Sequence, residues 1–174
     1  MFRATSALFL FALLLQAQQP ATPRKAPDLA IQVGEDKFIW LSEYSGKTRL
    51  VAVFMTTCPH CQYTTGILNK LQKEYAARGV QVLATAIEAM SSLHVADFKK
   101  QFQTQYPVGY NDQKYVAKFL GLPENDPLFV PPLVFVDKNG MVRAQFTGES
   151  PAMEKDVQEK NLRETLDKIL KETK

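Results

Sequence analysis

The chain has 174 residues, of which 45% are hydrophobic and 22% are charged, and its formal net charge is +3. This length and apolar content are typical of one globular domain that buries its own core. The small net charge, without a run of basic residues, argues against a nucleic-acid partner.

The first residues differ in composition from the rest of the chain. Arg3 gives a short positive start, residues 7–15 form an apolar stretch, and Leu15-Gln16-Ala17 resembles a small-residue cleavage site. This order predicts a secretory signal peptide over residues 1–17. The apolar stretch is shorter than the roughly 20 residues that a membrane span needs. An uncleaved N-terminal membrane anchor remains the alternative.

A polar, proline-rich segment follows the predicted signal. Residues 18–27 predict a flexible linker, and residues 28–174 predict the folded domain. We therefore expect an exported protein of the bacterial periplasm or cell envelope. In such a compartment a pair of cysteines can stay oxidised.

The domain begins with a predicted β-hairpin and a buried strand. Residues 31–33 and 38–40 are short apolar strands on either side of the turn residues Gly34-Glu35-Asp36. The uninterrupted apolar run at 50–55 predicts a central strand that is buried on both faces.

The only two cysteines of the chain follow that strand, in Cys58-Pro59-His60-Cys61. A cysteine at a helix N-terminus has its thiolate stabilised by free backbone N–H groups and by the helix dipole. A second cysteine three residues later can close a disulfide with the first. The motif therefore predicts thiol–disulfide exchange, with Cys58 as the nucleophile and Cys61 as the resolving thiol. No dissociable cofactor is needed.

Two other uses of the cysteines remain open. One is a static structural disulfide, and the other is half of a metal site. Structural zinc usually has four protein ligands, and beyond the motif the chain offers only His94 as a further histidine. Within the motif, Pro59 fixes φ in the first helical turn, where no N–H donor is missed. His60 is expected to stabilise the Cys58 thiolate by a hydrogen bond or by its charge.

The remaining pattern alternates helices and strands. We predict helices around residues 67–75, 95–104 and 116–120, strands at 80–87, 133–136 and 141–146, and a last helix capped by Ser150 and opened by Pro151. The last two strands form a hairpin at Asp137-Lys138-Asn139-Gly140. This order predicts an α/β fold, a three-layer α/β/α sandwich with a mixed central sheet and an N-terminal β-hairpin.

With these features the chain resembles the exported TlpA/ResA-like branch of the thioredoxin superfamily. The resemblance is carried by Ala26-Pro27-Asp28-Leu29, by residues 41–47, by the cysteine motif and by residues 130–140. It implies one βα insertion, formed by strand 80–87 and the helix after it. The motif sequence itself is similar to that of DsbA-like oxidases.

The resemblance also implies further site residues. A cis-proline is expected at Pro132, with Pro131 before it, and both line a substrate groove beside the disulfide. Glu88 matches an acidic residue of ResA-like sequences and is a candidate proton acceptor. Departures from the family occur at Ala52 and Thr64, where carboxylates are usual in thioredoxins and in ResA-like reductases. An exposed residue at a strand end is the alternative for Glu88.

The resemblance implies a TlpA/ResA-like thiol–disulfide oxidoreductase that acts on cysteine pairs of proteins. A membrane electron donor or acceptor is a further partner, and a monomer is expected. Two alternative functions remain open: a thiol peroxidase of the peroxiredoxin type, and a metal-binding or copper-delivery module that uses the two motif cysteines. Whether the protein reduces, oxidises or isomerises disulfides does not follow from the sequence.

Overall fold

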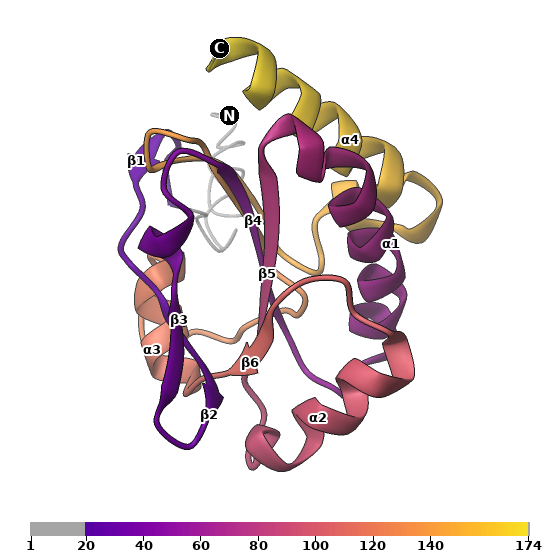
Figure 1. Cartoon of the computed structure of the whole chain (residues 1–174). Helices are drawn as coiled ribbons and strands as arrows, with labels where there is room; N and C mark the ends of the chain where they lie inside the picture. The colour runs from indigo at the N-terminus through magenta and orange to yellow at the C-terminus, as the bar shows by residue number, and fades with distance from the viewer. Residues whose placement is uncertain (1–19, 174) are drawn as a thin grey trace, which may run out of the picture.

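The computed structural model describes residues 20–173, which form a sheet covered by helices on both faces (Figure 1). The strands are β1 (Arg24–Lys25), β2 (Ala30–Gly34), β3 (Lys37–Trp40), β4 (Thr48–Phe54), β5 (Val80–Ala86), β6 (Val108–Tyr110), β7 (Leu133–Val136) and β8 (Met141–Phe146). The helices are α1 (Pro59–Tyr75), α2 (Ser91–Phe102), α3 (Gln113–Leu120) and α4 (Lys155–Glu172). Short 3₁₀ turns occur at Leu41–Tyr44, Ala76–Arg78 and Pro151–Met153.

The sheet has the strand order β1-β8-β7-β4-β5-β6-β2-β3. Strand β4 is parallel to β5 and antiparallel to β7, and β5 is parallel to β6. The N-terminal hairpin of β2 and β3 is attached through β6. The predicted mixed sheet and thioredoxin-like α/β fold are confirmed, and β5 and α2 are found where the βα insertion was expected.

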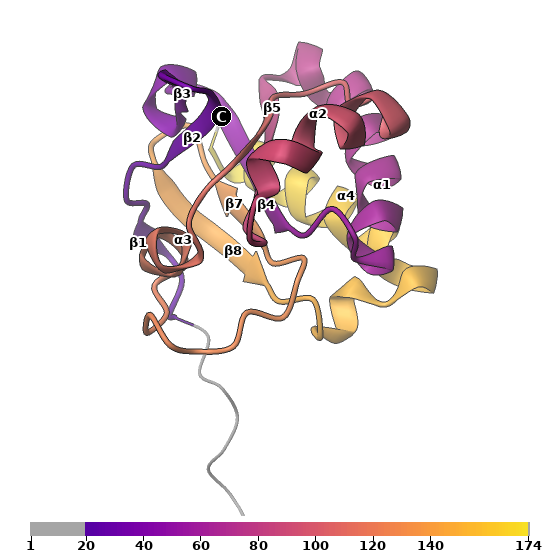
Figure 2. The ribbon, with the colours of Figure 1, turned by 90° about the horizontal axis from the view of Figure 1, so that it is seen from below.

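Two hydrophobic clusters fill the space on either side of the sheet. One cluster packs alternate β4 residues such as Leu50 and Phe54 against α1, α2 and α4. The other packs Val51 and Val53 against α3. Figure 2 shows these helices on opposite sides of the strands. Every residue of β4 is buried, as its continuous apolar run predicted.

The start of the domain differs from the sequence interpretation. Residues 24–25 of the expected flexible linker form β1, which pairs with β8. The Arg24 guanidinium also donates to the carbonyl of Phe119 at 3.1 Å and to Oε1 of Gln145 at 2.9 Å. These contacts use backbone groups, one cation and one side-chain amide, so no apolar pattern in the sequence signals them. The predicted signal peptide lies outside the described residues, and none of the helices within residues 20–173 is long and apolar enough to cross a membrane.

The last helix is also divided differently. Ser150 accepts a hydrogen bond from the N–H of Ala152 and so caps the 3₁₀ turn, as expected, but α4 begins only at Lys155. The break occurs because Glu154 is extended, with φ −62° and ψ 138°. Val157, expected on the buried face of the helix, is 38% exposed, and Gln158 is fully buried next to it.

Candidate active site

The two cysteines lie where β4 leads into α1. Cys58 is the N-cap of α1, with an extended backbone at φ −78° and ψ 117°, and its N–H donates to the carbonyl of Met55 at 3.2 Å. Pro59 is the first residue of the helix. The Cys58 sulfur accepts a hydrogen bond from the N–H of Cys61 at 3.3 Å. One of the free N–H groups of the helix start is thus aimed at this sulfur.

The two thiols differ in environment. Both are free, but Cys58 is half-buried whereas Cys61 is only 1% exposed and belongs to the core. Burial raises the pKa of the Cys61 thiol strongly, and its hydrogen bond with Cys58 raises it further. Cys61 is therefore kept protonated in the reduced protein, while the sulfur of Cys58 is the one that can be reached from solvent.

Glu88 is brought to the cysteines by the end of β5. Its Oε1 accepts hydrogen bonds from the backbone N–H of Thr56, at 2.9 Å, and from the Thr56 hydroxyl. Its Oε2 is buried and has no hydrogen-bond partner among the described residues. The charge of Glu88 also contributes to raising the pKa of Cys61, though less than burial does. The carboxylate thus adjoins the motif, and the alternative of an exposed strand-end residue does not fit.

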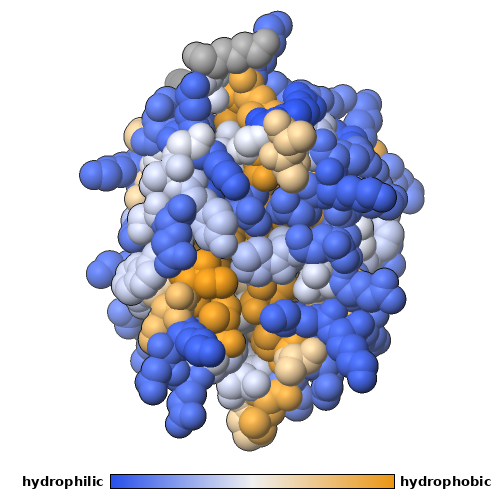
Figure 3. Space-filling model, viewed as in Figure 1, coloured by the Kyte–Doolittle hydropathy of each residue, from blue (hydrophilic) through white to orange (hydrophobic). Residues whose placement is uncertain are grey.

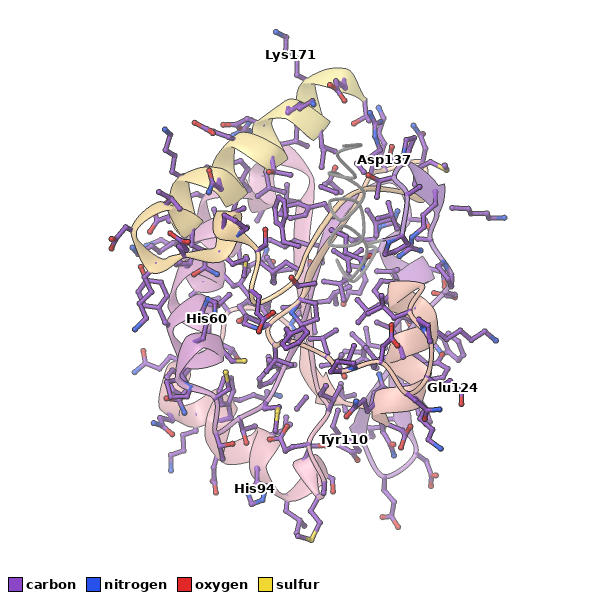
Figure 4. The ribbon with its side chains drawn as sticks, turned by 180° about the vertical axis from the view of Figure 1, so that it is seen from behind. His60, His94, Tyr110, Glu124, Asp137 and Lys171 are labelled. Atoms are coloured by element: carbon purple, nitrogen blue, oxygen red, sulfur yellow. The ribbon has the colours of Figure 1, made fainter. Side chains whose placement is uncertain are left out.

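His60 is bonded to the C-terminal part of the chain. Its Nε2 lies 3.0 Å from the carbonyl oxygen of Met153. A carbonyl only accepts, so this ring nitrogen carries the hydrogen. Figure 4 shows His60 on α1 with sulfur atoms nearby, and Asp137 at the far end of the sheet. The hydrogen bond expected from His60 to the Cys58 sulfur is not found in the described structure, where Cys61 supplies the donor.

A polar residue that the sequence interpretation missed supports the same turn of α1. Gln158 is fully buried on α4, and its Nε2 donates to Oγ1 of Thr64 at 2.9 Å. Thr64 in turn donates to the carbonyl of His60 at 2.9 Å. Thr64, which replaces the carboxylate usual in ResA-like reductases, therefore links α1 to α4. The signal for Gln158 was weak: one polar side chain on the apolar face of the last helix.

The proline loop requires a correction. The cis peptide bond joins Val130 to Pro131, so the cis-proline is Pro131 and not Pro132. The reason is the strand register. The carbonyl of Pro132 accepts from the N–H of Val53 at 3.0 Å and so continues the pairing of β7 with β4 by one residue. Both prolines are buried.

This loop and the cysteine motif are neighbours. Continuing the antiparallel register of β4 and β7 places residues 130–131 beside Phe54 and Met55, the residues that lead to Cys58. Val130 and Cys58 pack against the same hydrophobic cluster. His94, by contrast, is exposed on α2. Within residues 20–173 no three His, Cys, Asp or Glu side chains are grouped as ligands for a metal ion.

Comparison with known proteins agrees with this geometry. The sequence model of the Redoxin family matches residues 22–166. Thiol-disulfide oxidoreductase ResA of Bacillus thuringiensis subsp. konkukian is 25% identical over 126 residues, which cover 72% of this chain and 69% of the relative. The protein of the same name from Geobacillus thermodenitrificans is 29% identical over 123 residues, covering 71% and 67%.

A solved structure shares the fold. The putative thiol:disulfide interchange protein DsbE from Chlorobium tepidum superposes with a TM-score of 0.71 at 24% identity, covering 85% of this chain and 96% of that one. A hypothetical protein from Sinorhizobium meliloti also gives a TM-score of 0.71, at 21% identity, covering 87% and 85% of the two chains. The chain belongs to the Redoxin family, and it is a ResA-like thiol–disulfide oxidoreductase of the thioredoxin superfamily.

Proposed function

We propose that this protein exchanges disulfides with cysteine pairs of client proteins outside the cytoplasm, through Cys58-Pro59-His60-Cys61. The observation that carries the proposal is the inequality of the two thiols. Cys58 is accessible and accepts an N–H at the start of α1, whereas Cys61 is buried with a raised pKa. An exchange site needs one sulfur that attacks and one that is held back until the attack has occurred.

In the reducing direction the reaction has two steps. The Cys58 thiolate attacks one sulfur of a client disulfide, which forms a mixed disulfide and releases the first client thiolate. Cys61 then loses its proton and attacks the Cys58 sulfur, which breaks the mixed disulfide and releases the second client thiolate. The client gains two electrons and the protein is left with a Cys58–Cys61 disulfide. The oxidising direction reverses these steps.

Glu88 is the proton acceptor for the second step. The buried thiol of Cys61 must be deprotonated before it can attack, and water has little access to it at 1% exposure. The Oε2 atom of Glu88 is buried, without a partner among the described residues, and can take up a proton. Pro131, the cis-proline of the loop that neighbours the cysteine motif, is the loop residue that contacts a client bound at Cys58. A membrane electron donor or acceptor returns the pair to its starting redox state.

Trapping of clients tests the assignment. Cys61→Ser should accumulate mixed disulfides with client proteins, because the attack by Cys58 is intact and the resolving thiol is missing. Cys58→Ser should accumulate none. The products are resolved by non-reducing electrophoresis of extracts from cells that express each variant. Equal trapping by both variants, or trapping by Cys58→Ser alone, would reverse the roles of the two cysteines.

A further inference from the structure

The segment before Pro131 is held in place by a glycine of the next connection. The N–H of Gly148 donates to the carbonyl of Phe129 at 2.7 Å. A Cβ atom placed on Gly148 would lie 2.3 Å from the carbonyl oxygen of Val130 and 2.8 Å from that of Phe129. Contacts this short are repulsive and both atoms belong to the backbone, so any larger residue at 148 must displace the segment.

The segment that Gly148 holds is apolar and presents one aromatic ring to solvent. Residues 127–136 carry no charged side chain. Within that stretch Phe129 is the exposed large hydrophobic residue, at 39%, and it lies two residues from Pro131 in the loop beside the cysteine motif. Thr57 and Pro59, the sequence neighbours of Cys58, are exposed and also uncharged.

Other exposed apolar side chains are placed differently. Figure 3 shows apolar surface in the lower half of the face that carries β2, β3 and α2. The exposed large residues of those elements include Phe38 and Trp40 on β3 and Leu93 on α2. None of these residues belongs to the segment that adjoins Cys58, and nothing in the structure indicates what would cover them. Phe129 differs because the register of β4 and β7 places its loop beside the residues that lead to Cys58.

We propose that Phe129, positioned by Gly148, is a specificity residue that selects clients whose cysteine is flanked by large apolar side chains. The inference rests on the proposed exchange function of Cys58. An apolar flanking residue gains contact with the exposed part of the ring, whereas a polar one loses hydration there without a partner. The preference therefore affects the rate at which Cys58 attacks the client and the stability of the mixed disulfide that forms.

Two activated peptides measure this preference. Each carries one cysteine joined by a disulfide to thionitrobenzoate, flanked on both sides by Leu in one peptide and by Gln in the other. Gln has a similar size to Leu and no charge, so the pair isolates polarity. Reduced protein converts either peptide to a free peptide thiol and coloured thionitrobenzoate, and ends with a Cys58–Cys61 disulfide. The two released thiols balance the two that the protein loses.

The expected ratio of the two rate constants, Leu over Gln, is about fivefold for the unmodified protein, as partial burial of an aromatic ring allows. Phe129→Ala should bring the ratio close to one, and Gly148→Ala should lower it by displacing the segment. The ratio is measured on a single protein preparation, so changes common to both peptides cancel.

Two glycines provide controls. A Cβ on Gly66 of α1 meets nothing within 4 Å, so Gly66→Ala should keep the ratio. A Cβ on Gly109 would lie 2.2 Å from the carbonyl oxygen of Gln32, so Gly109→Ala introduces a comparable clash in another part of the sheet and should also keep it. An unchanged ratio in Phe129→Ala, or no preference in the unmodified protein, would overturn the specificity role. If the unmodified protein releases no thionitrobenzoate from either peptide, the proposed exchange function itself is wrong.

Discussion

Replacing Glu88 by Gln removes one carboxylate while leaving the local hydrogen bonds available. The amide oxygen of Gln can still accept from the N–H of Thr56, as Oε1 does at 2.9 Å, and from the Thr56 hydroxyl. The amide nitrogen takes the place of Oε2, which already lacks a partner among the described residues. We therefore expect a folded variant that differs mainly in charge and in its ability to take up a proton.

The substitution has two opposed effects on Cys61. The charge of Glu88 helps to raise the pKa of Cys61, so its removal eases ionisation of the thiol. Burial is the largest cause of the raised pKa and is unchanged, so this gain is the smaller effect. The loss of a positioned proton acceptor costs about 100-fold or more in a step that transfers a proton. The net expectation is a resolving step slowed by about two orders of magnitude.

Acid quenching of a single turnover, followed by alkylation and mass spectrometry, separates the mixed disulfide from the final products. Glu88→Gln should accumulate the mixed disulfide while its first step stays fast. Glu43→Gln is a matched control, because Glu43 also accepts a backbone N–H, that of Trp40 at 2.9 Å, in a different part of the fold. A resolving step that is unchanged or faster in Glu88→Gln would show that Glu88 acts on Cys61 only through its charge and is not the proton acceptor.

Two further outcomes follow from the contacts of the motif. Burial raises the pKa of Cys61 above its ordinary value of 9.0, so as the pH rises the unfolded chain ionises this thiol before the folded protein does. The buried neutral thiol therefore stabilises the reduced protein fully below about pH 9, and this stabilisation is lost as the pH rises above that value. Thermal unfolding at pH 8 and pH 10 should show a steeper loss for the reduced protein than for Cys61→Ser; parallel losses would contradict the raised pKa. His60→Phe should lower the free energy of unfolding by about 1 kcal/mol, because the hydrogen bond to Met153 is lost, while His60→Gln can keep a donor there. Denaturant titration of both variants checks this, and equal stability of His60→Phe and His60→Gln would show that the hydrogen bond to Met153 does not contribute to stability.

The sequence predicted the elements whose signals are local. The continuous apolar run of β4 and the cysteine at the first position before α1 were sufficient to place the redox pair at a strand–helix junction. Strand β1 was missed because its two residues are held by backbone pairing and by the hydrogen bonds of Arg24, which leave no apolar periodicity. The break before α4 was missed because Glu154 is extended within a stretch of helix-forming residues.

The position of the cis-proline depended on information that the sequence does not hold. The resemblance placed the cis bond at Pro132, but the carbonyl of Pro132 pairs with the N–H of Val53, about 80 residues earlier in the chain, and the cis bond precedes Pro131. The partners of His60 are of the same kind. Met153 is 93 residues away and reaches the motif only because the turn before α4 packs against α1. Contacts between distant segments decide these details, and composition cannot reveal them.

The hydrogen bonds of the reduced pair bear on its redox potential. In the reduced protein the Cys58 sulfur accepts the N–H of Cys61 at 3.3 Å. Interactions made only by the reduced form make the disulfide a stronger oxidant. The buried thiol of Cys61 does not oppose this, because a neutral thiol is buried at little cost whereas its thiolate is not. The same burial requires an acceptor for the proton of Cys61 whenever the disulfide is re-formed, and the proposed acceptor is Glu88, two residues after the end of β5. We therefore expect hydrogen bonds to the Cys58 sulfur to influence the redox potential of the pair, and the proposed proton acceptor Glu88 to influence the rate of the resolving step.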